Sequence, residues 1–178
     1  MILHKAGLNF LGLNMLLFKY LSPTKLFFLL LMTTSQGIQA GWNLDQSESS
    51  VEFISIKNNR ILETHSFQKL SGSITSTGIA NLTIGLDGVS TKIQIRDERM
   101  RNFLFETKLF PHATFSAQIP IAELEFRDEH FRIGEVNGRL NLHGMEADLK
   151  SKVMILHKNN TLRIITNHPI LISAENFN

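Results

Sequence analysis

The sequence contains no cysteine. Disulfide bonds, thiolate metal sites, catalytic thiols and lipidation of a processed cysteine are therefore excluded, and the fold has to be stabilised by its own apolar core. Tryptophan and tyrosine occur once each, so the aromatic girdles of an outer-membrane barrel are missing. Blocks of like charge are missing as well, which leaves nucleic-acid binding without support.

The first 40 residues differ in composition from the rest of the chain. They contain lysines and no acidic residue. An apolar run at 26–32 is followed by mostly small and polar residues up to Ala40. This layout predicts a signal peptide over 1–40, and hence an exported, periplasmic or secreted protein without a stable membrane span after cleavage. A transmembrane helix is the competing interpretation, but it needs ~20 continuous apolar residues, and two lysines and a proline interrupt them. Met15 offers an alternative, shorter start.

Removal of the leader changes the electrostatics of the chain. Three of the 18 basic residues and none of the 16 acidic residues lie in 1–40, so the formal net charge changes from +2 to −1. The basic isoelectric point therefore says nothing about an acidic partner.

From residue 41 onward, apolar residues recur with a period of two, which predicts strands rather than helices. The alternation is clearest at 51–56, 80–86, 140–142 and 162–165. The predicted turns are Lys57-Asn58-Asn59, Ser76-Thr77-Gly78, Leu86-Asp87-Gly88, Val136-Asn137-Gly138 and Lys158-Asn159-Asn160. Six or seven short strands at this spacing indicate one antiparallel sandwich or barrel domain over 41–178.

The segment 95–115 departs from that period, because a charge cluster is followed at once by aromatic residues. The spacing predicts a short helix over 97–109, with Asp97 as its N-cap, ending before Pro111. Its apolar side, with Met100, Phe103 and either Leu104 or Phe105, is expected to cover one end of the barrel. Two interpretations stay open for the charges: a polar collar that meets a ligand head group, or a cap and ion-pair cluster that fixes the helix. The residues concerned are Arg96, Asp97 and Arg99.

Several motifs in the chain are familiar in combination. They are Trp42, Asp45, Ser50-Val51-x-Phe53, Phe67, Ser71-Gly72-Ser73-Ile74, Val89-Ser90-Thr91, Ile95-Arg96-Asp97-Glu98-Arg99-Met100, Phe110-Pro111-x-Ala113-Thr114-Phe115 and Gly138-x-Leu140-x-Leu142-His143-Gly144. Together they resemble the YceI-like family across 41–178. The resemblance implies an exported, all-β, lipocalin-like antiparallel β-barrel that binds a polyisoprenoid chain, such as a quinone tail, in an elongated cavity.

The resemblance and the alternation together suggest which side chains line that cavity. Met100 and Phe103, on the short helix, are expected to gate one mouth. The expected lining residues are Val51, Phe53, Phe67, Leu82, Ile84, Met100, Phe103, Phe115, Leu140 and Leu142. Beyond this lipid, no cofactor is expected. An eight-stranded barrel has room either for packed side chains or for one slender ligand, so a filled core stays open as the alternative.

The C-terminal end departs from the family pattern. Relatives usually continue past Ala174-Glu175-Asn176-Phe177 with a loop and a closing strand, whereas this sequence stops at Asn178. We therefore expect that the barrel lacks its closing strand. The alternative function is that of a truncated copy with a structural or interaction role.

Catalytic chemistry has little support in the sequence. The histidines show no paired metal-ligand spacing, and no Gly-x-Ser-x-Gly motif is present. The acidic pairs Glu123 with Glu125 and Asp128 with Glu129 are typical of a solvated hairpin face rather than of an acid and base pair. We therefore expect neither an enzyme nor a metal site, and an isoprenoid-type lipid as the partner.

Overall fold

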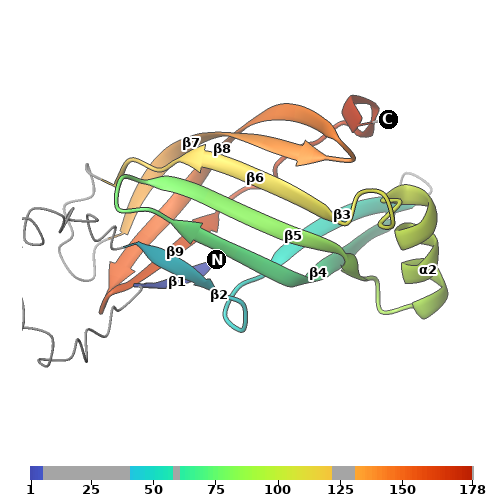
Figure 1. Cartoon of the computed structure of the whole chain (residues 1–178), viewed down its shortest axis with the longest axis horizontal. Coiled ribbons are helices and arrows are strands. Elements are labelled where there is room, and N and C mark those ends of the chain that lie inside the picture. The colour runs from blue at the N-terminus through green and yellow to red at the C-terminus, as the bar shows by residue number, and fades with distance from the viewer. Residues whose placement is uncertain (6–40, 58–60, 122–130, 178) are drawn as a thin grey trace, which may run out of the picture.

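The computed structural model describes residues 1–5, 41–57, 61–121 and 131–177 (Figure 1). Most of the predicted leader, the predicted turn at 58–59 and the acidic pairs at 123–129 lie outside these residues. The strands are β1 Ile2–Lys5, β2 Trp42–Asp45, β3 Val51–Lys57, β4 Ile61–Ile74, β5 Ile79–Ser90, β6 His112–Gln118, β7 Phe131–Leu142, β8 Met145–Lys158 and β9 Thr161–Thr166. The helical segments are α2 Gln94–Arg99, the π-helix η1 Met100–Leu104 and the 3-10 helix η3 Ala174–Phe177.

The strands form one antiparallel sheet in the order β2-β1-β9-β8-β7-β6-β5-β4-β3. β2 also pairs with β4, and this contact curls the sheet into a nearly closed barrel. One seam is unsealed. Among the described residues, β3 pairs only with β4, and 145–152 of β8 pair only with β7. The predicted all-β, lipocalin-like barrel with one short helix near one end is confirmed.

β1 closes the gap between β2 and β9 with a pentapeptide that occurs twice in the chain. Residues 1–5 and 154–158 both read Met-Ile-Leu-His-Lys, and the two copies pair with opposite edges of β9. Leu3 lies opposite Leu162 and both are fully buried, whereas in β8 the buried residue of the pentapeptide is Ile155. The same five residues therefore present different side chains to the core.

The helix differs from the prediction in its bounds and its cap. It begins at Gln94 with Ile93 at the N-cap position, so the assignment of Asp97 as N-cap is wrong. Asp97 lies inside the helix, and its carboxylate accepts hydrogen bonds from Thr91, from the backbone N–H at 2.7 Å and from the hydroxyl at 2.6 Å. The last turn is a π turn closed by Phe105 N–H to Met100 C=O, and Glu106, at φ 44°, ends it well before residue 109.

Two of the predicted turns are wrong and two are confirmed. The turns at 76–78 and 158–160 connect β4 to β5 and β8 to β9, and Asn159 and Asn160 have the positive φ that such tight connections need. Asp87-Gly88 instead lies within β5, where the register against β4 shifts. Asn137-Gly138 lies within β7, where it pairs with Lys150 and Leu149 of β8. A Cβ at Gly138 would stand 2.3 Å from Phe115 Cζ. Both glycines serve close approach within the sheet.

Candidate functional site

The candidate site is the apolar interior at the end of the barrel that carries α2. Strand pairing builds it from the sequence alternation: Leu82 lies opposite Phe115, and Phe115 lies opposite Leu140. Three neighbouring strands thus place these side chains in one row on the same face.

This interior cluster contains most of the residues that the sequence predicted as lining. Leu140 and Ile84 are buried, and the others are partly buried against them. The predicted residues in the cluster are Val51, Phe67, Leu82, Ile84, Phe115, Leu140 and Leu142. Phe177 of η3, which the sequence interpretation left out, is 5% exposed and packs into the same cluster.

Three aromatic rings meet where the cluster reaches the helix. The ring centroid of Phe53 lies 5.1 Å from that of Phe67 and 6.3 Å from that of Phe105, and Phe67 and Phe105 are 5.6 Å apart. Phe105 therefore occupies the position expected for Phe103. Phe103 itself is 81% exposed, and Met100 is half-buried. The helix starts earlier than predicted and ends in a π turn, which rotates Phe103 outward.

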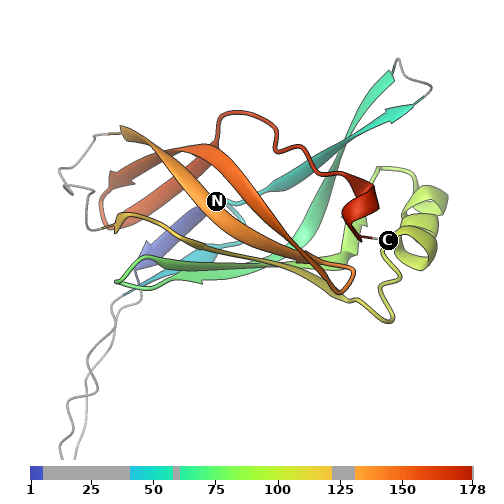
Figure 2. The same ribbon diagram turned by 90° about the horizontal axis from the view of Figure 1, so that it is seen from above.

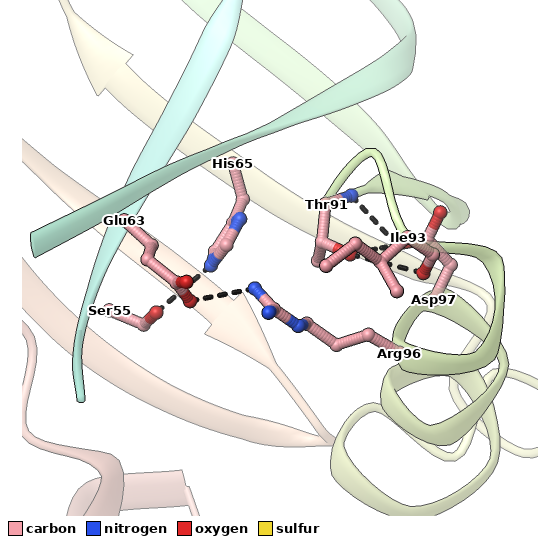
Figure 3. Close-up of polar contacts among 7 residues, drawn as sticks. All are labelled: Ser55, Glu63, His65, Thr91, Ile93, Arg96 and Asp97. Atoms are coloured by element: carbon pink, nitrogen blue, oxygen red, sulfur yellow. Dashed lines mark hydrogen bonds and ion pairs between the residues drawn. The ribbon is translucent and has the colours of Figure 1, made fainter. Parts of the chain in front are cut away.

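The facing side chains of β3 and β4 change from apolar to charged toward the end of the barrel beside α2, which we call the mouth. Their register pairs Val51 with Phe67, then Phe53 with His65, then Ser55 with Glu63. His65 is 4% exposed. Its Nε2 lies 2.9 Å from Ser55 Oγ (Figure 3). Its ring centroid lies 5.1 Å from that of Phe53.

Arg96 joins the helix to this polar end of the hairpin. Its guanidinium donates to the Glu63 carboxylate at 2.7 Å, and both side chains are 30% exposed. Figure 3 shows Arg96 reaching from α2 toward Glu63 while Asp97 turns back to Thr91. Arg99 is exposed. Of the predicted collar, Arg96 thus stands at the mouth and Asp97 fixes the connection before the helix.

Two opposing influences set the pKa of Asp97. Burial disfavours the charged carboxylate, but the hydrogen bonds from Thr91, with the nearby Arg101 charge, outweigh it and hold the pKa below its usual value. The carboxylate is therefore ionised at neutral pH and fixes the connection between β5 and α2 through Thr91.

A second polar group ties the C-terminal segment to the same end of the barrel. The imidazole of His143 places Nε2 2.8 Å from the Glu106 carboxylate and Nδ1 3.1 Å from the Phe177 carbonyl oxygen. Phe110 packs against the ring at a centroid distance of 4.2 Å. Glu106 and His143 both have positive φ, so two tight turns are joined by one side-chain contact.

Sequence reasoning missed Ser55, Glu63, His65 and Glu106. Ser55 could have been found, since it follows Phe53 in the same alternation. The others depend on pairing between distant segments. No group of three metal-binding side chains occurs within the described ranges. In that same part of the chain, none of the helices has the length and apolarity needed to cross a bilayer.

A nearly closed antiparallel barrel with an apolar interior is the architecture of the lipocalin-like proteins. A family model described as YceI-like domain matches residues 42–178, so the chain belongs to the YceI-like family.

Solved structures agree with this assignment. The chain is 32% identical, at a TM-score of 0.72, to a polyisoprenoid binding domain from Saccharophagus degradans implicated in plant cell wall breakdown; the match covers 76% of this chain and 79% of that one. BcnA from Burkholderia cenocepacia shares the fold at 18% identity and a TM-score of 0.59, over 75% and 83% of the two chains. No curated protein matches the chain.

Proposed function

We propose that this protein is a non-enzymatic, exported binding protein for an isoprenoid-type lipid. The isoprenoid tail occupies the apolar cluster between β5, β6 and β7, and the head group stays at the mouth near His65, Glu63 and Arg96. The observation that carries the proposal is the change from Phe67 through His65 to Glu63 along one face of β4. An apolar molecule with one polar end matches that order of side chains.

Removal of apolar surface from water supplies the binding free energy. A polyprenyl tail has no charge to pair, and each CH₂ group that it buries contributes about 0.8 kcal/mol before ordering costs. A few isoprene units therefore suffice for tight binding if the interior opens to receive them.

The aromatic rings at the mouth favour a second candidate. Phe53, Phe67 and Phe105 contact one another, and Phe177 packs beside them in the cluster. A tail that enters at the mouth has to displace these rings. A barrel in which they never move would be a filled-core protein with a structural or interaction role, and this is the alternative function.

The first test is to purify the protein from its own host, extract any bound lipid and analyse the extract by mass spectrometry, which identifies the lipid directly. Purified protein is then titrated with a long-tailed quinone and with a polyprenol. Saturable uptake of either compound is expected. Without uptake of any isoprenoid and without a co-purified lipid, the filled-core alternative holds.

Phe115→Trp is the matching variant. Phe115 packs directly over Gly138, so a larger ring has to move into the interior. We expect loss of long-chain binding and about 1–3 kcal/mol of destabilisation from overpacking. Phe131→Trp is the control, because Phe131 is an exposed residue of β7 and should keep full binding. Equal binding by both variants would contradict the proposed tail position.

A further inference from the structure

The segment that crosses the barrel mouth carries apolar side chains on the outside as well as the inside. Five large apolar residues between 93 and 109 are exposed: Ile93, Ile95, Phe103, Leu104 and Leu109. Phe103 and Leu109 are 81% and 70% exposed, which is unusual for large apolar residues so close together in sequence. Phe105, in the same segment, faces inward against Phe53 and Phe67. The segment therefore has an inner and an outer apolar side.

Exposed charges on this segment are mainly positive. Lys92, Arg99 and Lys108 are exposed cations, and Glu98 is the exposed acid. The remaining acids are engaged elsewhere: Glu106 binds His143, and Asp97 accepts from Thr91. Apolar side chains interspersed with cations are the combination that settles into the interface of an anionic bilayer.

We propose that 92–109, the segment formed by α2, η1 and the turn after them, is a docking surface for an anionic phospholipid membrane. Phe103 and Leu109 enter the boundary between head groups and acyl chains, and the exposed lysines and arginine contact the phosphates. In Figures 1 and 2, α2 lies at one end of the barrel. Docking there brings the mouth against the bilayer, because Arg96 belongs to α2 and binds Glu63 at 2.7 Å. A lipid can then pass between membrane and barrel without crossing water. The docking goes beyond the proposed lipid binding and is tested without an isoprenoid.

Co-sedimentation of the full chain with vesicles of phosphatidylethanolamine and phosphatidylglycerol is the first experiment. The double variant Phe103→Ser with Leu109→Ser should lose at least about tenfold in partition coefficient, since two large apolar side chains no longer leave water on docking. The matched control is Phe131→Ser with Ile133→Ser. These side chains are 62% and 61% exposed on β7, outside the helical segment, and their partition should equal that of the wild type.

Charge and insertion are measured separately. Arg99→Glu and Lys108→Glu should each lower binding to phosphatidylglycerol vesicles by about fivefold or more, and added salt should weaken wild-type binding. Because the chain has no cysteine, Phe103→Cys can carry a single polarity-sensitive dye. Its emission should shift to the blue on vesicles, whereas a dye at Phe131→Cys should not shift.

Three results would overturn the docking surface: equal losses in the two serine pairs, no blue shift at position 103, or equal binding to vesicles of pure phosphatidylcholine. The Phe115→Trp variant separates this proposal from the proposed function. It should lose isoprenoid binding and still dock like the wild type, because Phe115 lies inside the barrel.

Discussion

Gly138→Ala tests whether the packing of the barrel interior is as close as the structure shows. An added Cβ would stand 2.3 Å from Phe115 Cζ and 2.7 Å from the Ser116 carbonyl oxygen. The ring can swing away at its far end, but the carbonyl belongs to β6 and moves only with the strand. Overpacking of this kind costs about 1–3 kcal/mol, of which the lower unfolded-state entropy of alanine returns about 0.4–1 kcal/mol.

Thermal unfolding followed by circular dichroism measures the effect. For a chain of this size, 1 kcal/mol corresponds to roughly 2–4 °C, so a melting temperature lower by several degrees is expected. Gly134→Ala is the control within the same strand, because its new Cβ would meet nothing nearer than Ile155 Cδ1 at 3.8 Å. That variant should melt at or slightly above the wild-type temperature. The same melting temperature for both variants would refute the argument.

Three further predictions concern the mouth and the leader. Asp97→Asn should destabilise the protein near neutral pH and less so in acid, because a lowered pKa adds stability above about pH 4 that is lost as the pH falls through the folded value; an unchanged difference in melting temperature across pH would contradict this. His143→Ala should speed hydrogen exchange at 175–177 and leave β9 unaffected, since the side chain holds the Phe177 carbonyl; unchanged exchange there would count against the tie. N-terminal sequencing of protein from its own host should begin at Gly41, and an intact leader would contradict cleavage.

The strand pattern and the strand side chains that face the interior could be predicted because both follow from local alternation. Leu82, Phe115 and Leu140 each alternate with polar or small neighbours, and a period of two places every second residue on one face whatever the partner strand. The Asp-Gly and Asn-Gly dipeptides could not be interpreted in the same way. Asp87-Gly88 and Asn137-Gly138 have the composition of turns, but both lie inside strands. Their glycines leave room for Lys69 and Phe115, which an added Cβ would meet at 2.9 Å and 2.3 Å.

The mouth could be predicted only in outline. Its polar and aromatic character was visible in 95–115, yet the choice between Phe103 and Phe105 depends on where the helix starts and on its π turn, which set the helical phase. Glu63 and His65 are far from Arg96 in sequence, and the pairing of β4 with β5, with Ser66 opposite Ser90, brings them beside the start of α2. Pairing between distant segments carries no local signal.

β1, which carries the first copy of the pentapeptide, links export to architecture if the predicted signal peptide is cleaved. β1 is a strand of this barrel and also the start of the predicted signal peptide. Cleavage after Ala40 would remove β1, leaving Leu44 and Leu162 without the neighbour that Leu3 provides. Signal-peptide cleavage would thereby leave β2 and β9 unpaired along the edges that β1 covers. The precursor and the mature protein would then be two differently built barrels.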